Sequence, residues 1–140
     1  MTKSSCYCIT LRNASRRLTS LYDEALAPLG INVTQFSQLR NIGRFQPVSL
    51  TDLGKKMELD RSTVGRNTKL LERMGLVVAA PGEDHRENAL VLTGKGEVVL
   101  ERALPIWGEV QVRIAKRLGP GGLEGIVSAL DALIDDDLAN

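Results

Sequence analysis

The chain has 140 residues, of which 43% are hydrophobic and 25% charged, and its formal net charge is +1 at pH 7. These values are typical of one globular domain and exclude a disordered chain, while the near-neutral charge does not by itself indicate a nucleic-acid partner. The sequence has no apolar run of the roughly 20 residues that a membrane-spanning helix requires, and no signal-peptide pattern. We therefore expect a cytoplasmic protein without a membrane partner.

The first part of the chain predicts two helices. Apolar residues recur every three or four positions from Cys8 to Leu29, which is the spacing of an amphipathic helix, and Gly30 is placed to end it. A second helix follows, with Thr34 as its predicted cap and Pro47 as its end. One side of this second helix is expected to be apolar, with Phe36, Leu39, Ile42 and Phe45.

The next segment predicts two helices joined by a tight turn. In SLTDLGKKM, Ser49 is placed to cap a short helix, and the carboxylate of Asp52 lies where the first-turn amides are unpaired. After the turn MELD, Asp60 is placed to cap the helix RSTVGRNTKLLERM, which Gly75 ends. Two helices joined this closely indicate a helix-turn-helix.

The remaining elements predict a wing and two long helices. The stretches LVVAA and NALVLT are rich in valine and leucine, which favours two strands of a hairpin around the polar stretch PGEDHRE. Thr93 is placed to cap a long helix that Pro105 bends, and a last amphipathic helix follows GPGG. The expected fold class is mainly α with a small β wing: a winged helix-turn-helix flanked by N- and C-terminal dimerisation helices.

One face of the second helix of the helix-turn-helix suits contact with DNA. On a helical wheel one side is apolar, with Val64, Leu70, Leu71 and Met74. The other side carries Ser62, Gly65, Arg66, Lys69 and Arg73. Arginine can bind a guanine edge with two hydrogen bonds, and serine, threonine and lysine can bind phosphates or base edges. An ordinary solvated face is the alternative, but the order of capped helix, turn, helix and hairpin favours DNA reading.

The stretch LTDLGKKMELDRSTVGRNTKLLERMGLV, followed by DHR and LVLTGKG, resembles the MarR family of bacterial transcription regulators. The resemblance covers nearly the whole chain, and its most specific parts are LDRSTV, LERMGLV and the spacing of Asp-x-Arg to Leu-Thr. It implies a single domain over 1–140, in which 5–32 and 96–140 are dimerisation helices and 34–95 form the winged DNA-binding region. It also implies a homodimer whose two winged regions reach successive major grooves of a palindromic operator in double-stranded DNA. The wide apolar stripes of the terminal helices independently require a covering partner.

The wing has a pair of opposite charges, and the resemblance to the MarR family implies a role for each of them. In the family the Asp of Asp-x-Arg holds the Arg, whose guanidinium enters the minor groove, and here these residues are Asp84 and Arg86. A solvent-exposed charge pair of little energetic value is the alternative. Many relatives have an arginine where His85 stands and a basic residue in place of Ala79 or Ala80, so we expect a shallower salt dependence of binding here. The predicted DNA-binding residues are Arg61, Ser62, Thr63, Arg66, Lys69, Arg73, Asp84 and Arg86.

Both cysteines lie in the N-terminal stretch SSCYCITLRNASRR. If Cys6 and Cys8 lie on one helix they point about 200° apart, so a disulfide is expected between subunits or to a small thiol, unless a frayed N-terminus lets the two cysteines of one chain meet. In the organic-hydroperoxide-sensing branch of the family, a reactive cysteine precedes an L…ASR pattern, and the match places Cys8 at that position and Tyr22 where a tyrosine holds the thiolate. Arg12 stands where that branch usually has another tyrosine, and a cation one turn away would favour a thiolate. The alternative is that Cys8 packs as a small apolar residue, and Cys6 has less support as a sensor.

The function expected from these features is a homodimeric repressor that an inducer releases from its operator. Two inducers remain open: a peroxide that oxidises Cys8, or a small aromatic or phenolic ligand with the cysteines as packing residues. A helical interaction module that does not bind DNA is a remote alternative. No enzyme, cofactor or metal site is expected, because the single histidine lies in the wing loop and no acid and base pair stands at a plausible site.

Overall fold

The computed structural model of the chain describes residues 6–80 and 89–135. Two-thirds of the way through the chain a two-stranded antiparallel sheet interrupts a succession of helices. The elements are α1 (Tyr7–Leu26), the 3-10 helix η1 (Ala27–Leu29), α2 (Val33–Phe45), α3 (Leu50–Met57), α4 (Arg61–Arg73), β1 (Val77–Ala80), β2 (Ala89–Leu92), α5 (Gly94–Leu118) and α6 (Gly122–Ile134). This architecture confirms a mainly α fold with a small β wing.

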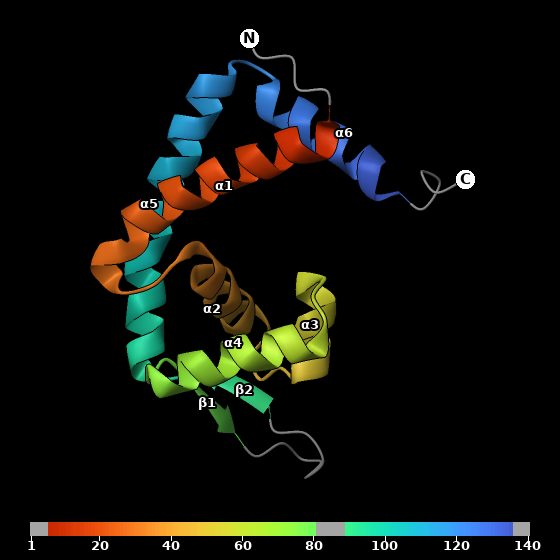
Figure 1. The fold of residues 1–140 in the computed structure, drawn as a ribbon. Coiled ribbons are helices and arrows are strands. Elements are labelled where there is room, and N and C mark those ends of the chain that lie inside the picture. The colour runs from red at the N-terminus through yellow and green to blue at the C-terminus, as the bar shows by residue number, and fades with distance from the viewer. Residues whose placement is uncertain (1–5, 81–88, 136–140) are drawn as a thin grey trace.

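The helices form two parts that α5 connects. Figure 1 shows α2, α3, α4 and the two strands gathered in one lobe, while α1, the second half of α5 and α6 lie together at the other end. The long helix α5 packs on α2 and β2 in the first part, and on α1 and α6 in the second. The winged unit and the terminal helices are therefore joined through one continuous element.

The caps of α3, α4 and α5 are those that the sequence predicts. They are Ser49, Asp60 and Thr93, and in each case a side-chain oxygen accepts a hydrogen bond from the backbone amide three residues later. Such a cap satisfies an amide that the helix cannot pair, and it contributes about 1 kcal/mol. The caps thus fix where each helix begins and which side chains it turns outward.

The cap of α2 differs from the prediction. Asn32, not Thr34, precedes the helix, because the Asn32 side chain accepts from the amide of Gln35 while the Gln35 side chain accepts from the amide of Asn32. This reciprocal capping box satisfies two amides, whereas a single threonine would satisfy one. The amide of Val33 also donates to Asp23 Oδ1 at 2.8 Å, which ties the start of α2 to α1.

The terminal helices agree with the sequence pattern, except that the predicted first helix is divided into two. The predicted first helix consists of α1 and the short helix η1, and Gly30 ends it with a left-handed φ of 74°. α5 continues past Pro105, and Figure 1 shows its second half leaning away from the direction of the first, as the proline predicts. No described helix is long and apolar enough to cross a membrane.

The hairpin pairs as expected. Val77 lies opposite Leu92 and Ala80 opposite Ala89 in an antiparallel register. An isolated bridge between Val48 and Leu90 adds the segment after α2 to the same sheet edge. Residues 81–88, which join the strands, lie outside the described part of the chain.

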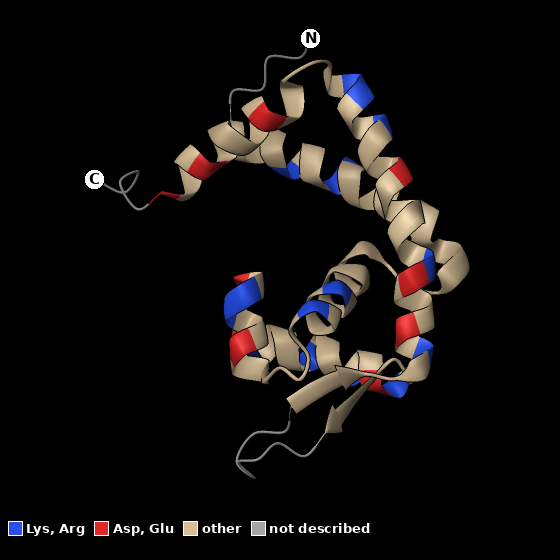
Figure 2. Ribbon diagram, turned by 180° about the vertical axis from the view of Figure 1, so that it is seen from behind, with Lys and Arg blue, Asp and Glu red and all other residues tan. Residues whose placement is uncertain are grey.

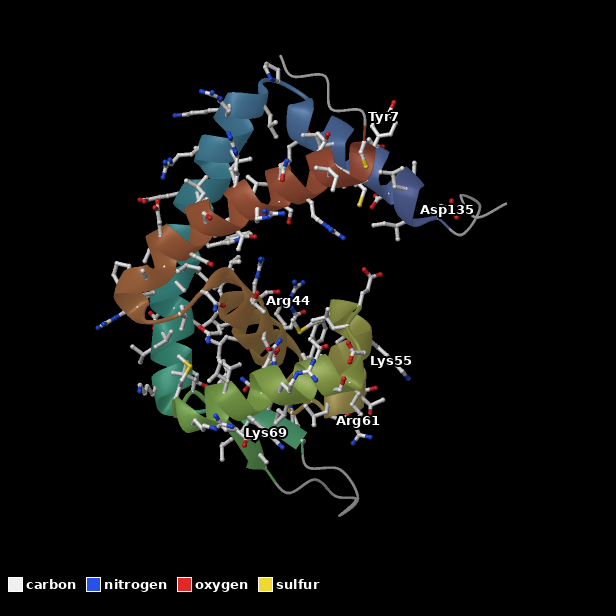
Figure 3. The ribbon with its side chains drawn as sticks, in the orientation of Figure 1. Tyr7, Arg44, Lys55, Arg61, Lys69 and Asp135 are labelled. Atoms are coloured by element: carbon white, nitrogen blue, oxygen red, sulfur yellow. The ribbon has the colours of Figure 1, made fainter. Side chains whose placement is uncertain are left out.

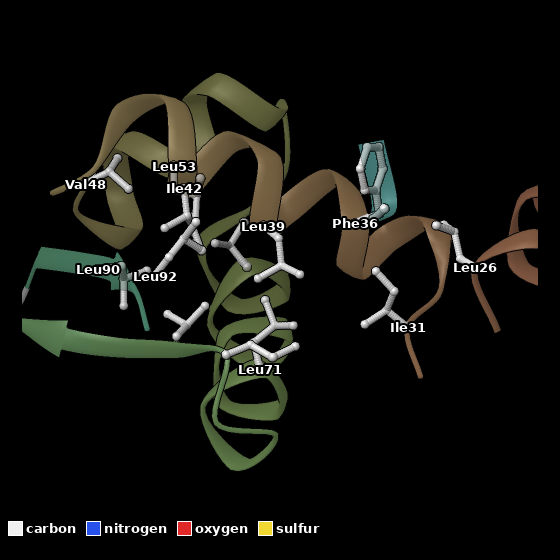
Figure 4. Packing of buried hydrophobic residues seen from close by; sticks show 14 residues of the cluster. Leu26, Ile31, Phe36, Leu39, Ile42, Val48, Leu53, Leu71, Leu90 and Leu92 are labelled. Carbon is white, nitrogen blue, oxygen red and sulfur yellow. The ribbon is translucent and has the colours of Figure 1, made fainter. Parts of the chain in front are cut away.

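The hydrophobic core lies in the winged unit. Figure 4 shows Leu39 of α2, Leu53 of α3 and Leu71 of α4 in one cluster with Leu90 and Leu92, so that three helices and the hairpin share one apolar interior. Burial of each such side chain contributes about 1.5–3 kcal/mol relative to exposure. This core holds α4 against α2 and the hairpin.

Two side chains expected on apolar faces are exposed instead. Phe45 is 38% exposed at the end of α2, where the ammonium of Lys56 lies 3.9 Å from its ring centroid. Leu70 is 44% exposed, because the buried side of α4 runs through Val64, Thr68 and Leu71. Positions separated by four and three residues share one helix face, and Leu70 lies about 100° away from Leu71. The sequence wheel was therefore correct for α4 except at Leu70 and at the polar Thr68.

Candidate nucleic-acid interface

The helix α4 turns one side to the core and the other to solvent. Val64, Thr68 and Leu71 are buried, whereas the outer side is exposed at Arg61, Ser62, Arg66, Lys69 and Arg73. Figure 3 shows Arg61 and Lys69 on the side of α4 that faces away from α2. The structure thus brings the cationic side chains predicted on this helix together on one accessible surface.

The first turn of α4 is a hydrogen-bonded cluster. The Asp60 carboxylate accepts from the hydroxyl of Ser62, from the hydroxyl of Thr63 at 2.6 Å and from the amide of Thr63 at 3.1 Å. Arg66 Nη2 in turn donates to Thr63 Oγ1 at 3.3 Å. The hydrogen bonds from Ser62 and then from Thr63 hold the pKa of Asp60 well below its usual range. These hydrogen bonds therefore favour the ionised form of the Asp60 carboxyl.

The wing residues are described only in part. Asp84, His85 and Arg86 lie outside the described residues, so their roles stay predictions from the sequence. The strand β1 presents the exposed Ala79 near the wing. The described part of the wing thus agrees with the expectation that its first strand carries no cation.

Other exposed cations lie beside the start of α4, and the sequence reasoning did not select them. Lys55 and Lys56 occupy the last turn of α3, and Figure 3 shows Lys55 directed away from the body of the protein. Lys56 lies over the ring of Phe45, as Arg44 also does with 5.8 Å from its guanidinium carbon to the ring centroid. The predicted tight turn already places the end of α3 beside the start of α4, but the sequence has no signal that separates these cations from ordinary solvated ones.

The two cysteines are exposed, and no disulfide joins them. Cys6 precedes α1 as its cap residue, with an extended backbone at φ −129° and ψ 113°, and Cys8 lies in the first turn. The two cysteines therefore do not lie on one helix, because α1 begins at Tyr7, one residue before the predicted start at Cys8. Arg12 is exposed and one turn further along α1 than Cys8.

Tyr22 joins α1 to α5. Its hydroxyl donates to Gln111 Oε1, and burial raises the pKa of the Tyr22 phenol. Fourteen residues of helix separate Tyr22 from Cys8, which corresponds to about 21 Å along the axis. Within one chain Tyr22 therefore does not approach Cys8.

The winged helix-turn-helix and the exposed cationic side of α4 define the class of protein. In helix-turn-helix proteins the second helix lies in the major groove, and α4 is the second helix here, with its apolar side on the core and arginine and lysine on its outer side. The class is that of transcriptional regulators with a winged helix-turn-helix.

Comparisons with known proteins identify the family. Residues 29–87 match the MarR family. The M. tuberculosis transcriptional regulator MosR, solved in complex with DNA, is 33% identical with a TM-score of 0.80, over 92% of this chain and 93% of that one. The S. aureus MepR–DNA complex is 20% identical with a TM-score of 0.84, over 94% and 98% of the two chains. The chain belongs to the MarR family.

A curated relative gives the same class. An uncharacterized HTH-type transcriptional regulator of Bacillus cereus is 31% identical over 97 residues, which are 69% of this chain and 63% of that protein. The chain thus matches somewhat less than two-thirds of the length of this relative. The relatives are transcriptional regulators, in agreement with the prediction that this protein is not an enzyme.

Proposed function

We propose that the protein is a homodimeric, sequence-specific DNA-binding repressor that binds a palindromic operator. The observation that carries the proposal is the outer side of α4, where Arg66, Lys69 and Arg73 are exposed opposite the core contacts of the same helix. In this proposal Arg66 binds a base edge in the major groove, and the neighbouring cations and hydroxyls bind phosphates. The structures of MosR and MepR in complex with DNA support the proposal.

The proposed dimer rests on the terminal helices. Within α6, which lies wholly in the described part of the chain, no side chain is buried. Leu130 is half-buried, and the other large apolar residues of this helix range from 39% exposure at Leu123 to 70% at Ile134. Figure 2 shows acidic residues along α6 and basic residues along α1. A second copy would cover the apolar stripes and pair these opposite charges. It would also present a second α4 about 34 Å away, one turn of DNA, or a multiple of that distance.

The wing is proposed to add a minor-groove contact. In this part of the proposal Arg86 enters an A·T-rich minor groove and Asp84 orients its guanidinium. The sequence pattern and membership in the MarR family support this assignment.

Substitution of the residues proposed to contact DNA tests whether the protein recognises its operator through them. The variants Arg66→Ala and Arg86→Ala should each remain folded dimers, and each should lose about 1–3 kcal/mol of operator binding, because one base or groove contact is removed. Gel-shift titration on a duplex selected by the wild-type protein from a random pool measures the loss. Arg102→Ala, which removes an exposed cation of α5, is the matched control. Unchanged affinity in both Arg66→Ala and Arg86→Ala would remove the assignment.

We also propose that oxidation of Cys8 releases the repressor. The supporting observation is that the Cys8 thiol is exposed in the first turn of α1, at the end of the proposed dimerisation region. The sulfur takes the terminal oxygen of an organic hydroperoxide, the O–O bond breaks, and an alcohol leaves while Cys8 becomes a sulfenic acid. The sulfur loses two electrons, and the peroxide gains them.

Peroxide treatment tests this inducer. Addition of tert-butyl hydroperoxide should release DNA from the wild-type protein and from Cys6→Ser, but not from Cys8→Ser. Fluorescence anisotropy of a labelled operator follows the release, and mass spectrometry locates the added oxygen. Equal release from wild type and Cys8→Ser, or no release from any of the three, would contradict the thiol mechanism. It would favour the small aromatic or phenolic ligand as inducer.

A further inference from the structure

A polar contact lies inside the core, between α2 and α4. Among the described residues the buried polar side chains are Gln38, which has 0% exposure, and Thr68, which has 3%. Gln38 Nε2 donates to Thr68 Oγ1 at 2.7 Å and to the carbonyl oxygen of Val64 at 3.4 Å. One amide group of α2 therefore binds α4 at two positions one helical turn apart.

This contact differs in kind from the rest of the α4 packing. Val64 and Leu71 flank Thr68 on the buried side and are fully covered by apolar neighbours. Apolar burial is not directional, so it favours close approach without fixing how a helix is rolled about its axis. A hydrogen bond has a narrow range of distance and angle. The two bonds of Gln38 therefore fix both the roll of α4 and its position along its axis.

The carbonyl oxygen of the Gln38 side chain indicates that this contact does not serve to stabilise the fold. Gln38 Oε1 is buried and accepts no hydrogen bond from the part of the chain that the structure describes. A buried oxygen without a donor is destabilising. A methionine at the same position would fill a similar space without that penalty. The amide thus adds direction where an apolar side chain would add stability.

We propose that Gln38 is a positioning residue for base recognition, and that it acts by setting the roll and axial position of α4. The inference rests on the proposed DNA-binding function. Arg66 and Lys69 project from the outer side of the helix on which Gln38 fixes Thr68. Binding groups must be held within about 0.5 Å and 10–20° of their productive geometry. Without the amide contact α4 stays packed, but its outer side chains no longer meet the base edges in one register.

Three variants separate this role from a purely structural one. In Gln38→Met/Thr68→Val both polar groups are replaced by apolar groups of similar size, which removes the hydrogen bond without leaving an unpaired partner. In Thr68→Ser a buried methyl group is lost while the hydroxyl that accepts from Gln38 is kept. Gln38→Met alone leaves the Thr68 hydroxyl in place. The full-length proteins are compared in thermal unfolding and in DNA binding.

The measured quantity is the ratio of affinities for two duplexes of equal length. One is the duplex that the wild-type protein enriches from a random pool, and the other is a scrambled sequence of the same composition. For Gln38→Met/Thr68→Val we expect a melting temperature at or above that of wild type and a ratio about tenfold lower, the size of one mismatched base pair. For Thr68→Ser we expect a lower melting temperature and an unchanged ratio. Gln38→Met should show the lower ratio as well.

The ratio of affinities should thus fall only in the variants that lack the Gln38 amide, and the loss of stability should appear in Thr68→Ser. A wild-type ratio in Gln38→Met/Thr68→Val would overturn the positioning role, and so would a ratio in Thr68→Ser that falls with its stability. If the wild-type protein itself enriches no sequence and shows no preference between the duplexes, the proposed DNA-reading function fails, and the inference fails with it. That result is recognised before any variant is measured.

Discussion

At the scale of a single residue, Asp60 organises the start of the helix proposed to read DNA. Its carboxylate caps α4 and accepts from the hydroxyls of Ser62 and Thr63, and Thr63 in turn accepts from Arg66. The sequence predicts the cap because an aspartate before a helix pairs with an amide only three residues away. It does not predict that the same carboxylate holds two hydroxyls that were expected to face DNA.

The lowered pKa of Asp60 makes the stability of the protein depend on pH in a defined direction. A carboxyl group with a lowered folded pKa contributes stability above its unfolded pKa of about 3.9, and this stability is lost as the pH falls toward the folded pKa. In Asp60→Asn an amide oxygen can still cap the helix but does not titrate. Below about pH 4, the free energy of unfolding of wild type should therefore fall more steeply than that of Asp60→Asn.

Urea denaturation of both proteins between about pH 7 and pH 2.5 measures the difference, and the other carboxyl groups cancel in the comparison. The two proteins should differ little at neutral pH, because both residues are good caps. Parallel curves over the whole range would show that the hydrogen bonds of Asp60 do not favour its ionised form.

At the scale of the elements, close contact between α5 and the end of the helix-turn-helix sets the position of the wing. Gly96 in the first turn of α5 is buried, and a Cβ atom there would lie 2.0 Å from the carbonyl oxygen of Leu76. The amide of Thr93 donates to that same oxygen at 3.0 Å. The backbone of α5 thus approaches the chain just before β1 more closely than any side chain allows.

Gly96→Ala should therefore destabilise the protein. A methyl group against a backbone atom forces the two segments apart, with a cost of about 3 kcal/mol in the free energy of unfolding. Gly94→Ala is the matched control, because a Cβ atom at this neighbouring position of α5 meets nothing within 4 Å. Chemical denaturation compares the two variants with wild type. Equal stability of both variants would show that the contact between α5 and Leu76 is not close in solution.

At the scale of the whole molecule, the terminal helices have more apolar surface than one chain covers. The stripe of α6 includes Ile126 at 42% exposure and Val127 at 50%. Among the described residues, none of α6 belongs to the hydrophobic core, which joins the winged unit with Leu26 of α1 and Ala103 of α5. The proposed dimer thus gives α6 a role that is separate from the stability of the winged unit.

A charge placed in this stripe should separate the dimer. Ile126→Glu would have to bury a carboxylate without a partner, which should weaken association by at least about 2 kcal/mol. Light scattering after size exclusion measures the mass, and operator binding should weaken with it. Ser128→Glu adds the same charge about 200° away on α6 and is the control. An Ile126→Glu protein that remains dimeric would contradict the proposed role of α6.

The sequence by itself determined the order and type of the elements, three of the four predicted caps and the cationic side of α4. These features depend on residues that lie within one or two turns of each other. Helix periodicity, the capping oxygens of Ser49, Asp60 and Thr93, and the valine- and leucine-rich composition of the hairpin strands are all signals of this local kind.

Only the tertiary structure decided the contacts between residues far apart in the chain. It placed the polar Gln38 in the core against Thr68, joined Tyr22 to Gln111, and brought Gly96 against the backbone of Leu76. From local sequence a glutamine in a helix is expected to face solvent, and only the packing of a second helix shows that its amide has a buried partner. The physical reason is that burial and hydrogen bonding depend on the neighbours that the fold supplies, and local sequence does not specify them.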